Sequence, residues 1–396
     1  MRVAMYYPWV YLKGGIERTI LELVRRSHHE WTIFTSHYRP DDTFPEFADV
    51  DIRQIGSISV KRDLVTVARA CSQLLLRGGE WSDYDALMVN CDGIGNLLAL
   101  RAHGLPLLCL CHTPLKVGYD DHARERWLRV QRPSLFTRAG VQAFKQADRL
   151  AWRRYRRVFC VSKEVERRLQ AAGVVRPEQT EILHPAVDLD RFVPSGRRED
   201  YFLMPGRIMW SKNVELGLRA FLRFQAASPG DAKRLVIAGA VDDKSRPYLA
   251  QLRELATGRS GIEFVENPSD EQLLDLYDRS LAVLFTPPNE DWGIVPLEAM
   301  AFGKPVIAVD RGGPAESIVD RESGLLCRDD PDAFAAAMRL IATDEELYEH
   351  LASGARARVL RYDWNGFVGR IDEYLDELHK ESVHKEKLAL EDAHRV

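Results

Sequence analysis

At 396 residues, with 45% hydrophobic and 29% charged residues, the chain has an ordinary globular composition and is too long for one hydrophobic core. Its formal net charge of -4 is too small to indicate nucleic acid or another highly charged partner. The six cysteines include no Cys-x-x-Cys pair, so we predict free thiols in a reducing compartment. No apolar run has the length of a signal peptide core or approaches the ~18 residues of a membrane span, which predicts a cytoplasmic protein.

Short apolar, β-branched runs alternate with amphipathic stretches in both halves of the chain. This alternation is typical of α/β domains with a buried parallel sheet. We therefore expect two Rossmann-like domains, with ligands bound at the carboxyl ends of the strands in a cleft between them. The predicted strands are Arg2–Tyr6, Trp31–Thr35, Ala86–Asn90, Leu107–Cys111, Val158–Val161, Tyr201–Met204, Leu235–Ala238, Ile262–Val265, Ala282–Phe285 and Val306–Ala308.

Residues 186–199 are polar, rich in turn residues and without periodicity, so they predict a linker. The two domains are then expected at residues 1–185 and 200–361. A helix is predicted over residues 362–380, and the highly charged residues 381–396 are expected to form a polar, disordered tail.

In each half, a glycine-containing turn follows the first strand. Gly14-Gly15 precedes the first helix, where bare backbone N–H groups can bind an anion, although a plain turn selects glycine equally often. Gly206-Arg207 follows the strand that begins the second half, and Lys212 comes five residues after the arginine. These two cations can neutralise a diphosphate without a metal; solvated surface cations are the alternative.

The most specific stretch is Thr286–Asp310, which contains a loop carrying Glu290 and a helix carrying Glu298. We place Pro296 at the first helical position and Glu298 in the first turn. Glu298 could then be a carboxylate that interacts with the helix dipole, and Glu290 a solvated loop acid. A glycosidase pair is disfavoured, because eight helical residues already rise about 12 Å, beyond the ~5–10 Å of such pairs. Two separate anchors for sugar and ribose fit better.

Two further patterns carry weaker signals. His112 follows an apolar strand in Cys-His-Thr-Pro, a position where a buried structural histidine is the commoner outcome. Asp188-Leu189-Asp190 resembles a motif that binds a metal–nucleotide complex, but Asp-x-Asp also begins at Asp49 and Asp83. Because Arg207 and Lys212 supply cations, we expect no metal in the site.

The spacing of Glu290 and Glu298 and the residues around them resemble the Glu-x7-Glu motif of the family-4 retaining glycosyltransferases, which have the two-domain GT-B fold. The resemblance extends from Gly14-Gly15 through Gly206-Arg207 to Gly312-Gly313 and Glu316, although the N-terminal matches are looser. It implies an acceptor-binding N-terminal domain, a nucleotide-sugar-binding C-terminal domain, and a last helix that returns to the N-terminal domain. Trp292 departs from the family, in which phenylalanine or another residue is usual.

The same resemblance assigns roles to residues. Arg207 and Lys212 would bind the diphosphate, Glu290 and His112 the donor sugar, and Glu298 the ribose. The backbone of Gly293, Ile294 and Val295 would contact sugar and phosphate, and the base would lie near Ile208 and Val265. The acceptor hydroxyl would attack on the face that the diphosphate leaves, so no protein nucleophile is required. No cofactor is expected either, because the nucleotide sugar is a substrate.

Within the family, the Glu290 region is most similar to bacterial and dolichol-pathway mannosyltransferases. We therefore expect a hexose, mannose from GDP-mannose, to be transferred to an acceptor hydroxyl, including that of a lipid-linked saccharide. The alternatives are a UDP-glucose or UDP-N-acetylglucosamine transferase with a soluble acceptor, an epimerase or phosphorylase, and a non-catalytic nucleotide-sugar-binding protein. No lysine motif for pyridoxal phosphate is visible, and the intact acidic and basic residues disfavour loss of catalysis.

The segment Arg124–Arg157 holds eleven basic residues and two acidic ones, with aromatic and aliphatic residues between them. This composition is typical of helices that lie on an anionic membrane, which would make the protein peripheral on the inner membrane face. An amphipathic helix packed on the sheet explains the pattern equally well.

Overall fold

The structure is a computed structural model that describes residues 1–56, 64–76, 81–91, 93–101 and 104–393. It divides into two compact units. The first contains Met1–Pro185 and the C-terminal segment from Trp364, and the second contains Ala186–Asp363.

The first unit is built on a seven-stranded parallel sheet in the order β5-β3-β1-β6-β7-β8-β9. The five strands predicted in this half are confirmed within a residue or so at each end. Sequence reasoning missed β5 and β9, because short, polar edge strands carry little apolar signal. The strands are β1 (Arg2–Tyr6), β3 (Glu30–Thr35), β5 (Ile52–Gln54), β6 (Ala86–Cys91), β7 (Leu107–Cys111), β8 (Arg157–Cys160) and β9 (Thr180–Ile182), and β2 (Trp9–Val10) pairs separately with β4 (His37–Tyr38). The helices are α1 (Gly15–Arg26), α2 (Leu64–Leu76), α3 (Lys116–Tyr119), α4 (Asp121–Gln131), α5 (Leu135–Trp152), α6 (Lys163–Ala171) and α14 (Trp364–Ala393).

The second unit has a six-stranded parallel sheet in the order β12-β11-β10-β13-β14-β15. The five strands predicted in this half are present, and β15 was missed. The strands are β10 (Tyr201–Pro205), β11 (Arg234–Gly239), β12 (Ile262–Glu266), β13 (Ala282–Phe285), β14 (Val306–Val309) and β15 (Gly324–Cys327). The helices are α7 (Val214–Ala227), α8 (Arg246–Ala256), α9 (Asp270–Arg279), α10 (Ile294–Ala301), α11 (Pro314–Ser317), α12 (Pro331–Thr343) and α13 (Glu345–Val359).

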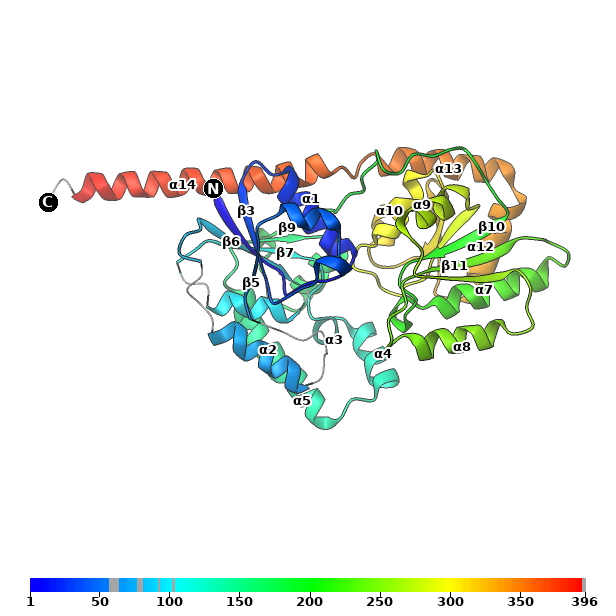
Figure 1. Cartoon of the computed structure of the whole chain (residues 1–396), viewed down its shortest axis with the longest axis horizontal. Helices are drawn as coiled ribbons and strands as arrows, with labels where there is room; N and C mark the ends of the chain where they lie inside the picture. Colours follow the sequence, from blue (N-terminus) through cyan, green and yellow to red (C-terminus); the bar gives the residue numbers. More distant parts are fainter. Residues whose placement is uncertain (57–63, 77–80, 92, 102–103, 394–396) are drawn as a thin grey trace. The chain divides into compact units, whose positions relative to one another are not determined.

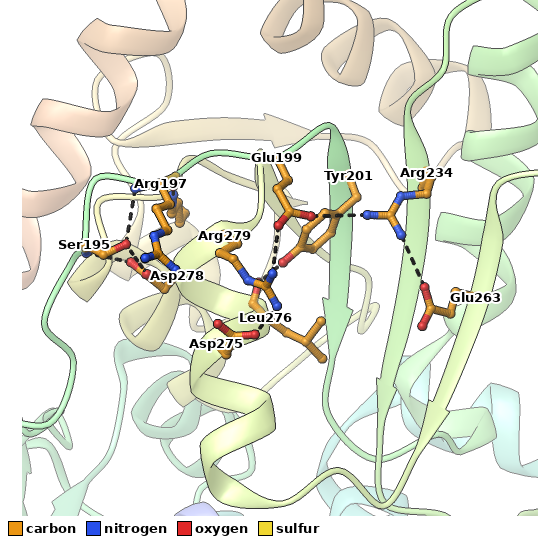
Figure 2. A network of polar contacts seen from close by, with 11 residues as sticks. Ser195, Arg197, Glu199, Tyr201, Arg234, Glu263, Asp275, Leu276, Asp278 and Arg279 are labelled. Carbon is orange, nitrogen blue, oxygen red and sulfur yellow. Dashed lines mark hydrogen bonds and ion pairs between the residues drawn. The ribbon is translucent and has the colours of Figure 1, made fainter.

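The segment 186–199 contains no helix or strand, and polar contacts tie its end to α9 (Figure 2). The backbone N–H of Ser195 donates to Asp278 at 2.8 Å. Arg279 donates to Glu199 at 2.8 Å and also pairs with Asp275. The linker is therefore attached to the second unit, and its contacts hold α9 beside the start of β10.

The C-terminal segment differs from expectation. We expected residues 381–396 to be disordered, but α14 continues to Ala393, and residues 394–396 lie outside the described residues. The segment is helical despite its high charge, because residues 370–393 contain no glycine or proline and are rich in helix-forming Glu, Lys, Leu and Ala. The amino-terminal part of α14 packs beside α1 (Figure 1), as expected of a helix that returns to the N-terminal domain.

All six cysteines are free, as predicted. Among the described helices, none combines the length and the hydrophobicity that crossing a bilayer requires.

Candidate functional site

The carboxyl ends of β10 and β13 border a pocket in the second unit. Gly206 has a φ of +121° and directly follows β10. A Cβ on Gly239, at the end of the neighbouring β11, would lie 1.7 Å from the carbonyl oxygen of Gly206. Glycine at position 239 is therefore required for the 206–208 turn to pass over the sheet.

This pocket brings together four of the predicted residues. Arg207, Ile208, Lys212 and Val295 all line it, together with apolar residues from β10 and β13. Ile208 is buried, whereas Arg207 is exposed and forms no ion pair with the described residues. An apolar wall with two cations at its rim is suited to a ligand that has a flat ring and an anionic group.

Lys212 lies at the end of a short 3₁₀ turn, Trp210–Lys212. Thr286, just after β13, donates from its hydroxyl to the Lys212 carbonyl at 2.9 Å. The ammonium of Lys212 pairs with the carboxylate of Glu290, and both side chains are mostly buried. The structure thus places two predicted site residues in direct contact, an arrangement that the sequence did not indicate.

The loop that carries Glu290 is fixed by two glycines. The N–H of Gly313 donates to the Glu290 carbonyl at 2.9 Å. A Cβ on Gly312 would lie 2.3 Å from the Glu290 carbonyl oxygen, and one on Gly313 would lie 2.1 Å from that of Trp292. Gly312 also has a φ of +71°. Glycine is therefore required at positions 312 and 313, because the backbone of residues 290–292 lies too close to them to leave room for a side chain.

Trp292, the residue that differs from the one usual in the family, is buried. Its ring contacts the ring of Tyr362 edge to face, with 5.2 Å between the centroids. Tyr362 in turn donates to the backbone carbonyl of Glu316 at 3.3 Å. Trp292 thus anchors the loop by packing against Tyr362.

The helix after this loop begins earlier than we predicted. α10 starts at Ile294, so Pro296 is its third residue rather than its first, and Glu298 lies beyond the first turn. Gly293, with a φ of +86°, is the N-cap and offers no side-chain cap. The positive φ of Gly293 lets the chain turn into the helix two residues before the proline that we used as the start signal. The N–H groups of Ile294 and Val295 therefore lie at an uncapped helix end, which favours an anion.

Glu298 is consequently not a helix-dipole carboxylate. Its Oε2 accepts a hydrogen bond of 2.6 Å from the hydroxyl of Tyr277 on α9. Tyr277 is 1% exposed and stacks on Phe302 at 6.1 Å, and burial together with the nearby Glu298 raises its pKa. The bonds described for Glu290 and Glu298 go to different residues, Lys212 and Tyr277, and the assignment of the two carboxylates as separate anchors stays a prediction. Sequence reasoning missed Tyr277, because a tyrosine inside an amphipathic helix gives no signal of its own.

Val265 lies on β12, in register with Ala238 of β11, which is in register with Pro205 of β10. It therefore shares the carboxyl edge of the sheet with the pocket but does not line it. Asp188 accepts from the backbone N–H of Asp190 at 3.2 Å, so this pair forms a turn.

The remaining predicted residues belong to the first unit. Gly14 is the N-cap of α1 and makes no side-chain cap, and Gly15 is the first helical residue. His112, directly after β7, donates from Nε2 to the amide oxygen of Asn90 on β6 at 3.0 Å, and both side chains are buried. Burial lowers the pKa of His112 to about 3, so its ring is neutral near pH 7.

Known protein families match both halves of the chain. Residues 13–191 match the family model described as Glycosyltransferase Family 4, and residues 189–358 match the one described as Glycosyl transferases group 1. HepE of Anabaena, solved in complex with UDP and glucose, superposes with a TM-score of 0.74 at 16% identity, covering 95% of this chain and 99% of HepE. The fold is therefore GT-B, an α/β architecture with two Rossmann-like domains.

Two curated relatives narrow the assignment. The α-1,3/1,6-mannosyltransferase ALG2 of Mus musculus is 27% identical over 92% of this chain and 94% of its own length. A D-inositol 3-phosphate glycosyltransferase of Nocardioides is 31% identical over 67% of this chain and 61% of its own length. The chain belongs to the glycosyltransferases that match the family-4 and group-1 models, and it is similar to mannosyltransferases of that group.

Proposed function

We propose that this enzyme transfers mannose from GDP-mannose to a hydroxyl of a lipid-linked saccharide, with retention of anomeric configuration and without a metal. The observation that carries the proposal is the pocket at the end of β10, which Arg207, Lys212 and Val295, near the uncapped start of α10, all line. The choice of mannose is supported by the mannosyltransferase relative, which matches nearly the whole chain.

In the reaction, the bond from the anomeric carbon to the diphosphate oxygen breaks and a bond to the acceptor oxygen forms. The acceptor proton passes to the departing phosphate oxygen. Negative charge grows on the diphosphate as it leaves, and fixed cations near that charge lower the barrier. Arg207 and Lys212 supply these cations, and the N–H groups of Ile294 and Val295 supply donors.

The Lys212–Glu290 ion pair suggests how the site responds to the donor. A diphosphate offers Lys212 a second anionic partner, so the ammonium can move from the carboxylate towards the phosphates. The carboxylate of Glu290 is then available to accept hydrogen bonds from sugar hydroxyls. Glu298, held by Tyr277, is proposed to accept from the ribose hydroxyls. Gly14, Gly15 and His112 are proposed to complete the sugar and phosphate contacts from the first unit.

The alternative donor is a UDP-sugar, and it is favoured by the likeness to HepE, which was solved with UDP and glucose. The inositol-phosphate relative likewise favours a soluble acceptor as the alternative to a lipid-linked one.

A thermal-shift panel of GDP, UDP and ADP, each alone and as its sugar, tests the donor. A ligand that binds only the folded protein raises the melting temperature, so GDP and GDP-mannose are expected to give the largest shifts. Stabilisation by UDP without stabilisation by GDP would refute the proposed donor. A Lys212→Ala variant is the control, because it should lose the shift from every diphosphate.

We also propose that the turn between α4 and α5 contacts an anionic membrane. Leu135 and Phe136, at the start of α5, are 79% and 86% exposed, and the neighbouring Arg129 and Arg132 are exposed as well. Apolar anchors beside cations are the pattern of an interfacial segment. α5 also packs inward, because Ala151 and Trp152 are buried, so only part of Arg124–Arg157 is available to lipid.

Liposome flotation tests this surface. Binding is expected with anionic vesicles, and it should weaken in high salt as charges are screened. The double substitution Leu135→Ser and Phe136→Ser should abolish flotation, whereas Leu360→Ser, at an exposed leucine of the second unit, should not. Equal recovery with neutral and anionic vesicles, or no recovery with either, would contradict the proposal.

A further inference from the structure

A cluster of two histidines and two aspartates lies where the end of α1 meets α14, and it includes none of the residues assigned to transfer. Ser27 caps the C-terminus of α1, and His28 and His29 connect it to β3. Asp372 and Asp376 lie one turn apart on α14, so their carboxylates share a helix face. All of these residues belong to the first unit, in which α1 and α14 pack together (Figure 1).

Three atoms of this cluster have the spacing of metal ligands. Nε2 of His28 lies 3.3 Å from Oδ1 of Asp376, and Nε2 of His29 lies 3.6 Å from the same oxygen. The two imidazole rings are adjacent, with centroids 4.2 Å apart, and the three ligand atoms all lie within 4.8 Å of one another. Metal–ligand bonds of ~2.0–2.2 Å in a tetrahedral site place neighbouring ligand atoms about 3.3–3.6 Å apart. Two of the three separations therefore already suit a bound ion.

Asp372 has a different place in the cluster. Its carboxylate accepts hydrogen bonds from the Ser27 hydroxyl at 2.5 Å and from the His28 backbone N–H at 3.1 Å, and it lies 3.0 Å from Nδ1 of His28. It is buried, unlike Asp376. A carboxylate that binds Nδ1–H fixes the tautomer in which Nε2 carries a lone pair, and this is the usual support for a metal-binding histidine.

His29 is held against the same helix. Its side chain is 3% exposed, and its Nε2, besides lying near Asp376, is 3.4 Å from the backbone carbonyl oxygen of Asp372. Coordination of an ion would replace this hydrogen bond.

We propose that His28, His29 and Asp376 bind a divalent transition metal of the Zn²⁺ type, with water at the fourth position and Asp372 orienting His28. Imidazole and carboxylate ligands in a tetrahedral arrangement favour Zn²⁺ over Mg²⁺ or Ca²⁺, which prefer oxygen. Because the ligands come from the α1–β3 connection and from α14, the ion joins the C-terminal helix to the body of the first unit. This site shares no residue with the proposed transfer site, where no metal is proposed. Without the ion, the same residues form ordinary His–Asp pairs.

Titration of untagged, chelator-treated protein with Zn²⁺ at about pH 8, followed by calorimetry, tests the site. One ion per chain is expected to bind, and the melting temperature should rise with Zn²⁺ concentration. Co²⁺ in the same site should give the visible absorption of a tetrahedral complex. Asp376→Asn and His28→Ala should each abolish stoichiometric binding, and Asp372→Asn should weaken it ~10–100-fold.

His379→Ala is the matched control, because His379 is an exposed histidine on the same helix outside the cluster. It should bind Zn²⁺ as the wild type does. His28 and Asp376 are both partly exposed, so their variants are expected to fold, and circular dichroism checks this. The proposal is overturned if the wild type takes up no stoichiometric Zn²⁺, if either ligand variant still binds it fully, or if His379→Ala also loses it.

Discussion

The hydrogen bond from Tyr277 to Glu298 allows a prediction whose size follows from the structure. Tyr277→Phe removes only the hydroxyl that lies 2.6 Å from the Glu298 carboxylate, and the ring keeps its place against Phe302. Without this bond Glu298 gains rotamer freedom that must be lost again on binding ribose. Ordering a glutamate side chain costs about 1–2 kcal/mol, so GDP should bind ~5–30-fold more weakly.

Isothermal titration of GDP into the wild type, Tyr277→Phe, Glu298→Gln and the double variant measures this coupling. The loss from Tyr277→Phe should largely disappear when Glu298 is already Gln, because the tyrosine acts through the glutamate. It should also disappear with 2′,3′-dideoxy-GDP, which lacks the hydroxyls that Glu298 is proposed to bind. Tyr348→Phe removes the hydroxyl of another buried tyrosine of the second unit and should leave GDP affinity unchanged. Unchanged affinity in Tyr277→Phe, or additive losses in the double variant, would refute the reasoning.

Four further predictions concern the other site residues. Glu290→Gln should lower the transfer rate ~10²-fold or more while GDP still binds, and a rate within a few-fold of wild type would remove Glu290 from the mechanism. Arg207→Ala and Lys212→Ala should each weaken GDP binding in calorimetry, and equal affinity in both variants and wild type would exclude a diphosphate contact. Gly312→Ala should destabilise the protein by at least ~1–3 kcal/mol in urea unfolding, because its Cβ meets the Glu290 carbonyl and its φ is positive. The pKa of His112 is about 3 in the folded protein, below its value of about 6.5 in the unfolded chain, so the free energy of unfolding should fall as pH drops between these values, by about 1.4 kcal/mol per pH unit. In His112→Gln the free energy of unfolding should decline less steeply over this pH range. Identical pH profiles for the variant and the wild type would contradict the argument from burial.

Much of the fold could be predicted because it depends on apolar periodicity. Continuous runs such as Leu107–Cys111 are buried on both faces of a parallel sheet, and a strand of that kind is visible in the sequence. β5 and β9 were missed because edge strands need not be apolar. The start of α10 was misplaced because Pro296 is a common first helical residue, while the positive φ of Gly293 is a property of the fold.

The candidate site was only partly predictable, for a related reason. The types and spacing of Glu290 and Glu298 identified the chemistry, but which side chain each carboxylate contacts depends on tertiary packing. Lys212 and Glu290 are 78 residues apart in sequence, and Tyr277 and Glu298 are 21 apart on different helices. Local patterns contain no information about such pairs.

Transfer of labelled mannose from GDP-mannose to a lipid-linked saccharide acceptor, measured in EDTA, tests the central proposal most directly. The account predicts labelled product of retained anomeric configuration and one GDP released per sugar transferred, with no gain on adding Mg²⁺ or Mn²⁺. Transfer from a UDP-sugar and none from GDP-mannose, an inverted product, or activity that EDTA abolishes and a divalent cation restores would contradict it.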